Sequence, residues 1–139
     1  MNEFYELSRD ILILMAHKLQ PKFQELGIYP GQEVFLNIIA NNDGITAIEL
    51  ASLTNRKRST ITKALQSLEK NGYIERKSSS DKRKLPIYIT PKGKELNEEV
   101  LKNIKSIWSD LEKKITEEEK NTVINLLKKI KEDLKEEKC

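Results

Sequence analysis

The sequence has little of the chemistry that most enzymes and metal sites need. Its 139 residues include one cysteine, Cys139 at the last position, and one histidine, His17. A single cysteine excludes an internal disulfide, and one histidine with one cysteine is too few for a typical zinc site or a nucleophilic triad. A Gly-rich phosphate loop is also absent. We therefore expect no enzymatic activity, no cofactor and no metal, although a site made of carboxylates alone stays open.

Loop-forming residues and long apolar runs are also scarce. Five glycines and four prolines predict few loops and long regular elements. The longest apolar run, residues 11–16, is too short to span a bilayer or to form a signal-peptide core. Hydrophobic residues make up 37% and charged residues 34%, which predicts a small core and some apolar surface buried against a second copy. We expect a soluble, cytoplasmic protein.

The charge is distributed unevenly along the chain. The overall net charge is +3. Residues 45–94 carry 12 basic and 4 acidic side chains, a net charge of +8, whereas residues 1–44 are at −3 and residues 95–139 at −2. A basic block between mildly acidic flanks indicates nucleic acid as the first partner to consider. The alternative is a lysine-rich surface that only faces solvent.

Apolar spacing predicts helices at both ends of the chain. The first covers residues 3–20, where Pro21 would interrupt or bend it. Another starts after Thr90-Pro91 and runs to about residue 115, and the last follows a T-x-x-E capping box at residues 116–119. The last helix carries apolar residues at a spacing of four, three and four, which suits packing against another helix.

The middle of the chain predicts three short helices followed by a hairpin. The first of these would begin at Pro30 and end at the turn residues 41–44, and the next would open at a capping box, residues 46–49. The third would end at Asn71-Gly72. The period then changes to two, which predicts strands at 73–77 and 85–89 around a polar tip. Pro86 makes the second an edge or irregular strand.

Helix, turn, helix and hairpin in this order is the winged helix-turn-helix plan. Several motifs follow one another across residues 28–93: Pro30-Gly31-Gln32, Glu49-Leu50-Ala51, Arg58-Ser59-Thr60-Ile61-Thr62-Lys63, Leu68-Glu69-Lys70-Asn71-Gly72-Tyr73-Ile74, Asp81-Lys82-Arg83 and Ile89-Thr90-Pro91-Lys92-Gly93. In their order and spacing, these motifs resemble the MarR (multiple antibiotic resistance regulator) family.

The resemblance implies a mainly helical chain with a small β-hairpin wing, one MarR-like domain over residues 1–139. Residues 30–90 would form the DNA-binding region, and residues 1–29 and 91–139 would form a homodimer. The implied dimer contacts are the apolar positions of the end helices: Phe4, Leu7, Ile11, Val123, Leu127, Ile130 and Leu134. Family members often have a small polar cap where Tyr29 stands, and a glycine in the turn that here reads Thr54-Asn55-Arg56-Lys57.

The helix that begins near Arg58 has the properties of a recognition helix. On a helical wheel its apolar residues occupy about a third of the circumference, and short polar side chains and cations face the other way. That mixture reads base edges and phosphates. The candidate contacts of this helix and the preceding turn are Arg56, Lys57, Arg58, Ser59, Thr60, Thr62, Lys63 and Gln66.

The hairpin tip carries the second set of DNA-binding candidates, Lys82, Arg83 and Lys84. A narrow minor groove has a strong negative potential that attracts an inserted arginine, and we expect Arg83 to enter it. Asp81 would be repelled by phosphates, so we expect it to pair with an arginine and set the shape of the wing. Arg76 and Lys77 would add phosphate contacts. The alternative is a solvated loop.

A ligand-binding site is weakly marked. His17, Tyr29 and Trp108 are the candidates for a pocket, although packing would explain each of them. The family implies a small aromatic or anionic ligand that releases the protein from DNA. Members that sense peroxide have an N-terminal cysteine, which is absent here.

The residues predict a sequence-specific DNA-binding regulator, and the resemblance implies that it is a dimeric repressor with a roughly palindromic site whose half-sites lie ~10 bp apart. The alternative is a winged-helix module that binds protein and has no operator. The basic block speaks against this alternative, since an exposed apolar patch would suit it better.

Overall fold

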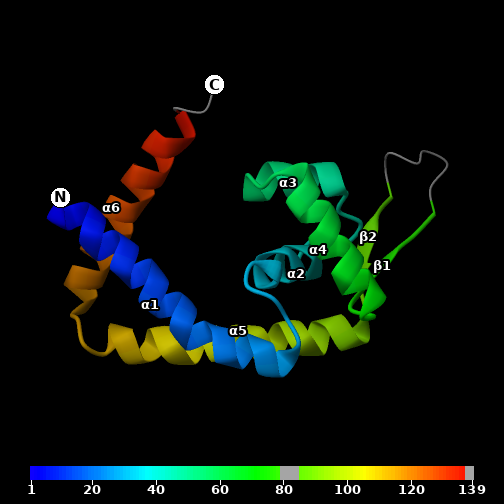
Figure 1. The fold of residues 1–139 in the computed structure, drawn as a ribbon, viewed down its shortest axis with the longest axis horizontal. Coiled ribbons are helices and arrows are strands. Elements are labelled where there is room, and N and C mark those ends of the chain that lie inside the picture. Colours follow the sequence, from blue (N-terminus) through cyan, green and yellow to red (C-terminus); the bar gives the residue numbers. More distant parts are fainter. Residues whose placement is uncertain (79–84, 137–139) are drawn as a thin grey trace. The chain divides into compact units, whose positions relative to one another are not determined.

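A computed structural model describes residues 1–78 and 85–136 of the chain (Figure 1). Within them lie helices and one two-stranded antiparallel sheet, which confirms the predicted fold class, mainly helical with a hairpin. The elements in chain order are α1 (Glu3–Leu26), α2 (Gln32–Ala40), α3 (Ala47–Thr54), α4 (Arg58–Lys70), β1 (Ile74–Arg76), β2 (Ile87–Ile89), α5 (Pro91–Glu112) and α6 (Glu117–Glu136).

The chain divides into two compact units, Met1–Asn103 and Ile104–Cys139, and the boundary falls inside α5. In the first unit, α2, α3 and α4 gather beside the hairpin, with β1 directly after the end of α4 (Figure 1). The core of this group consists of aliphatic side chains with almost no exposure: Leu36, Ile39, Leu50, Ile61, Leu65, Leu68, Ile74 and Ile87. These elements therefore form the packed body on which α4 is held.

α1 is longer than predicted. It continues through Pro21 to Leu26 and ends at Gly27, which takes the left-handed conformation with φ of 73°. The expected interruption at Pro21 is wrong. A proline inside a helix removes one hydrogen bond and strains one turn, whereas Phe23, in the following turn, is buried at 2% exposure. Burial of this ring holds the last turns in place.

α2 begins at Gln32, two residues after the predicted start at Pro30. Gly31 is the N-cap and has no side chain that could accept a hydrogen bond. Side chains from the first turn of the helix accept hydrogen bonds from the preceding amides instead. The Gln32 Oε1 accepts from the Tyr29 amide at 2.9 Å, and the Glu33 Oε2 accepts from the Gly31 amide at 2.6 Å. Since these side chains satisfy the free amides, Tyr29 can stand where relatives often have a polar cap.

The hairpin pairs Ile74 with Ile89 and Arg76 with Ile87, so both strands are shorter than predicted. Pro86 lies just before β2, and its carbonyl accepts from the Lys77 amide at 3.1 Å. Ile45 adds an isolated bridge to Ile87, in which the Ile87 amide donates to the Ile45 carbonyl at 2.9 Å. This bridge was not predicted, because a single residue gives no alternating pattern.

The start of α5 is fastened to the segment that follows α4. The Thr90 Oγ1 donates to the Gly72 carbonyl at 2.7 Å and accepts from the Gly93 amide at 3.0 Å, so the predicted Thr90-Pro91 cap is confirmed. A Cβ on Gly93 would clash with the Tyr73 carbonyl oxygen. Only glycine therefore permits this approach of α5 to the chain before β1.

Candidate nucleic-acid interface

The turn between α3 and α4 positions the proposed recognition helix. Asn55 closes α3 in the left-handed conformation (φ 54°, ψ 31°), and its amide donates to the Ala51 carbonyl at 3.0 Å. It is the one residue other than glycine with positive φ in the described part of the chain. Asparagine tolerates this conformation better than most residues, so it can stand where the resemblance led us to expect a glycine.

α4 has two faces of opposite character. Ile61, Ala64, Leu65 and Leu68 are buried, as the helical wheel predicts. On the other side the predicted contacts are exposed, together with the preceding turn: Arg56, Lys57, Arg58, Ser59, Thr60, Thr62, Lys63 and Gln66. The Thr62 hydroxyl donates to the Arg58 carbonyl at 2.9 Å. The buried face fixes the orientation of α4 and leaves the polar face available to a partner.

The C-terminal end of α4 and the hairpin strands make further contacts that the sequence did not indicate. The Lys92 ammonium donates to the Asn71 carbonyl at 2.9 Å and lies 4.9 Å from the centre of the Tyr73 ring. Lys77 lies 4.5 Å from the centre of the Tyr88 ring. The Arg76 Nε lies 4.0 Å from the Glu69 Oε2. Lys92 thus adds a cation beside the C-terminal end of α4; the sequence places it in a family motif, but it was not among the predicted DNA contacts.

The wing tip is outside the described residues. The predictions for Asp81, Lys82, Arg83 and Lys84 fall there. They stay predictions.

The predicted dimer contacts are exposed in the single chain. In α1 they are Phe4, Leu7 and Ile11, and in α6 they are Val123, Leu127, Ile130 and Leu134. Further large apolar side chains on the same helices are also exposed, including Leu12, Leu14 and Leu126. Apolar surface of this extent is typical of a surface that a partner covers.

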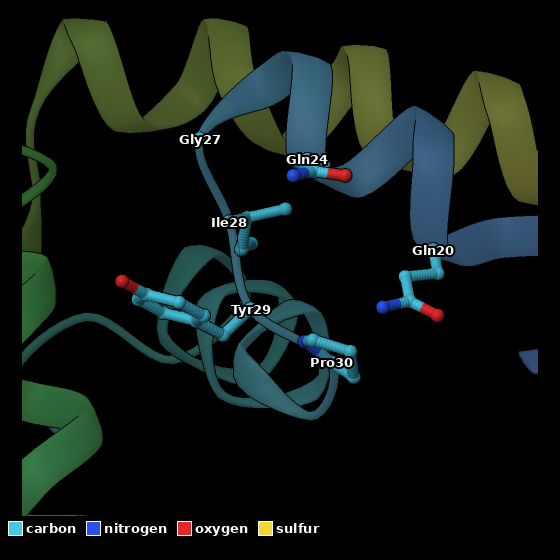
Figure 2. A pocket seen from close by; sticks show the side chains of 6 residues that line it. All are labelled: Gln20, Gln24, Gly27, Ile28, Tyr29 and Pro30. Atoms are coloured by element: carbon cyan, nitrogen blue, oxygen red, sulfur yellow. The ribbon is translucent and has the colours of Figure 1, made fainter.

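The three candidate ligand residues lie in different surroundings. Tyr29 lines a pocket of about 350 Å³ with Gln20, Gln24 and Pro30, and Figure 2 shows its ring on one side and the Gln20 and Pro30 side chains on the other. No residue that lines this pocket is charged. Trp108 lines a second pocket, of about 420 Å³, with residues of α5 and α6. His17 is exposed.

Helix α6, which contributes to the second pocket, begins with a capping box, as predicted. The Thr116 amide donates to the Glu119 Oε1 at 2.9 Å, and the Glu119 amide donates to the Thr116 Oγ1 at 3.0 Å. The hydrogen bond from the Thr116 backbone, and then that with its side chain, lower the pKa of the Glu119 carboxyl below its ordinary value. The first turn of α6 is therefore stabilised by an ionised Glu119.

The described part of the chain contains no cluster of three or more His, Cys, Asp or Glu side chains that could hold a metal ion. None of its helices combines the length and the apolar character needed to cross a bilayer.

The fold and the polar helix face together define a winged helix-turn-helix protein. The sequence model of the MarR family matches residues 28–85. A transcriptional repressor of Bacillus subtilis, YetL, is 30% identical over 85% of this chain and 72% of its own length. The chain belongs to the MarR family.

Another similar relative is a regulatory protein assigned to the hcr operon of Thauera aromatica, 31% identical over 75% of this chain. The match spans 63% of the length of that relative.

Solved structures of the family show the same fold. Staphylococcus aureus MarR in complex with salicylate and kanamycin has a TM-score of 0.89 and 29% identity, covering 97% of this chain and 92% of that one. A MarR family regulator of Listeria monocytogenes in complex with a 26mer DNA has a TM-score of 0.84 and 28% identity, covering 96% and 90%.

Proposed function

We propose that this chain is a transcription regulator that binds a specific double-stranded DNA site through α4, the turn before it and the wing. The observation that carries the proposal is α4 itself, whose apolar face is buried and whose opposite face exposes Ser59, Lys63 and Gln66. The three cations at 56–58 precede and open this helix, at the end where recognition helices approach base edges. The DNA complex of the Listeria relative supports this proposal.

The same proposal includes a homodimer. Residues 1–29 and 91–139 would supply the dimer contacts, and residues 30–90 would bind DNA. The exposed apolar positions of α1 and α6 support this division, because a chain with a small core needs a partner to cover them. A two-fold dimer would bind a roughly palindromic site with half-sites ~10 bp apart.

Repression and release by a small ligand complete the proposal. The repressor named among the relatives and the salicylate complex among the solved structures support it. The ligand would be a small aromatic or anionic compound. Since the proposed partner is double-stranded DNA, the proposed location is the cytoplasm.

Selection of bound sites from a random duplex DNA pool tests this function, with affinity then measured against salt concentration. We expect one palindrome to be enriched, a specificity ratio above ~10³, and affinity that falls steeply with salt. Weak, salt-sensitive binding without enrichment would contradict the proposal and favour a winged-helix module that binds protein.

Two substitutions then separate base contacts from phosphate contacts. Gln66→Ala should relax discrimination at particular base positions, because glutamine can read a base edge. Lys57→Gln should weaken binding equally across sequences and lower the salt slope of the dimer by about 1.8, because each of the two protomers loses one phosphate contact worth about 0.9. Arg83→Ala in the wing should weaken operator binding while the protein stays folded, and unchanged affinity would remove Arg83 from the interface.

A further inference from the structure

Two polar side chains are buried in the part of the chain that the structure describes, Gln32 and Asn97, each with 7% exposure. Gln32 has an evident role, because its Oε1 accepts from the Tyr29 amide at the start of α2. Asn97 lies inside α5, away from both ends of the helix. It shares the buried face of α5 with Leu96 and Val100, where an aliphatic side chain would pack without a polar group to satisfy.

The Asn97 side chain reaches α2, in the proposed DNA-binding region (Figure 1). Its Nδ2 donates to the Asn37 Oδ1 at 3.4 Å, across 60 positions of the chain. The Asn37 Oδ1 also accepts from the Asn41 Nδ2 at 3.3 Å, and this Nδ2 donates to the Asn37 carbonyl at 2.8 Å. Three side-chain amides therefore connect the C-terminal end of α2 with α5.

The Asn97 amide is poorly satisfied in this position. Within residues 1–78 and 85–136 its Oδ1 is buried and has no hydrogen-bond partner, and its one hydrogen bond is longer than the usual N–H···O distance. A buried acceptor without a partner lowers stability, and asparagine is a weaker helix former than leucine. The stability of the fold therefore gives no reason for an asparagine here.

The geometry of the contact gives a different reason. Aliphatic side chains pack with similar energies in several registers, whereas the Asn97 Nδ2 meets its acceptor in one placement of α2 along α5. Any shift or rotation of α2 would leave the donor of this buried amide unpaired as well as its acceptor. In coiled coils, a single polar residue in an apolar interface selects one register for the same reason.

We propose that Asn97 is a positioning residue that fixes the orientation of the DNA-binding region on α5 and thereby sets the half-site spacing that the dimer accepts. α5 carries Asn97 and continues into the second unit, which supplies dimer contacts. One base pair moves a half-site by about 3.4 Å and turns it by about 35°, so the spacing is sensitive to this orientation. The effect on spacing rests on the proposed function, whereas the orientation itself does not.

A series of duplexes tests the effect on spacing. The palindrome selected from the random pool is shortened or lengthened at its centre by one and by two base pairs, and fluorescence anisotropy gives each affinity. The unmodified protein should lose at least tenfold in affinity for a change of one base pair. Asn97→Leu should lose less than about threefold, and its affinity for a single half-site should stay within about twofold, because it changes no DNA contact.

Urea unfolding separates positioning from packing. Leucine has the branched shape of asparagine without its polar atoms, and the Asn37 Oδ1 keeps its bond from Asn41. Asn97→Leu should therefore be at least as stable as the unmodified chain. Leu96→Ala is the matched control at the neighbouring buried position. It should lower the urea midpoint, because it leaves a cavity, and keep the spacing profile of the unmodified protein.

The acceptor is tested separately. Asn37→Leu should broaden the spacing profile as Asn97→Leu does and should lower stability, because the buried Asn97 Nδ2 then has no acceptor. The double variant with Asn37→Leu and Asn97→Leu should regain the stability and not the profile. A spacing profile of Asn97→Leu equal to that of the unmodified protein, or a broadened profile in Leu96→Ala, would overturn the proposal.

The orientation is also measured without DNA. Nitroxide labels are attached to Lys63→Cys in α4 and Glu98→Cys in α5 of a full chain with Cys139→Ser, diluted with unlabelled chain so that only distances within one chain are observed. Electron–electron double resonance should give one narrow distance distribution. Adding Asn97→Leu should at least double its width, and an unchanged width would show that Asn97 does not fix the orientation.

The two proposals fail in distinguishable ways. If no duplex is enriched from the pool, the proposed function fails, while the label distances still decide whether Asn97 fixes the orientation. If DNA binds and Asn97→Leu broadens the distances without changing the spacing profile, the proposed function stands and the role of Asn97 in spacing is wrong.

Discussion

α4 and α6 carry the same kind of sequence pattern and have opposite surroundings. Each helix has apolar residues along one face and polar or charged residues along the opposite face. In α4 that stripe is buried within the chain, with Leu65 at 1% exposure, whereas in α6 it is open, with Leu127 at 59%. A periodic pattern therefore shows that a helix has an apolar face, and does not show whether the chain itself or a second copy covers it.

The largest effect is expected when a negative charge is introduced into the exposed apolar face of α6. Leu127→Glu should prevent dimer formation and lower affinity for a two-half-site operator by about 10²–10⁴-fold, because the two recognition helices then bind independently. Sedimentation and fluorescence anisotropy measure the two consequences. Asn125→Glu adds the same charge to α6 away from the apolar stripe and should leave both unchanged. A Leu127→Glu protein that stays dimeric would show that this stripe is not the interface.

The second prediction compares the two helices directly. Leu65→Ala should lower the free energy of unfolding by about 3 kcal/mol at any protein concentration, because it leaves a cavity in the core of the chain. Leu127→Ala should act mainly on the dimer, so its effect should decrease as protein concentration rises. Urea unfolding followed by circular dichroism at several concentrations separates the two. Equal, concentration-independent losses would mean that α6 is covered within its own chain.

A smaller effect is expected at the turn that leads into α4. Asn55→Ala should lower the free energy of unfolding by about 1 kcal/mol, since alanine is strained in the left-handed conformation. Asn55→Gly should cause no loss, and thermal unfolding measures both. If the glycine variant lost as much as the alanine variant, the side chain of Asn55 rather than its backbone conformation would stabilise the turn.

The smallest effect is expected at the start of α6 and depends on pH. Because folding lowers the pKa of Glu119, its contribution is present above the ordinary carboxyl range and is lost as pH falls through the lowered pKa. The stability difference between the unmodified chain and Glu119→Gln should therefore shrink as pH falls below the ordinary carboxyl pKa of 4.5. Urea unfolding at each pH measures it. Glu118→Gln is the control, and its difference should not follow the same course.

Local signals predicted much of the fold. The capping boxes at Thr46 and Thr116 and the Thr90-Pro91 cap were read from short motifs, because a cap is a contact between residues three positions apart. The helix continues through Pro21 against the expected interruption, because the burial of Phe23 is a tertiary effect that a local rule does not include.

The candidate site was predictable only where helical periodicity or a short motif determines which residues are exposed. The wheel of α4 gave the exposed residues, since burial on one face follows from periodicity. The position of Lys92 beside the Tyr73 ring was not predictable, because it depends on how the start of α5 packs against the chain that follows α4.

The contact between Gly93 and Tyr73 has a mechanical consequence. Thr90 joins the Gly72 carbonyl to the Gly93 amide through two short hydrogen bonds, and no side chain fits between α5 and the chain that leaves α4. Because this contact is close and hydrogen-bonded on both sides, the end of α4 and the first turn of α5 should move together rather than independently. The amides of Tyr73, Thr90 and Gly93 should accordingly exchange with deuterium together, as one slowly opening unit.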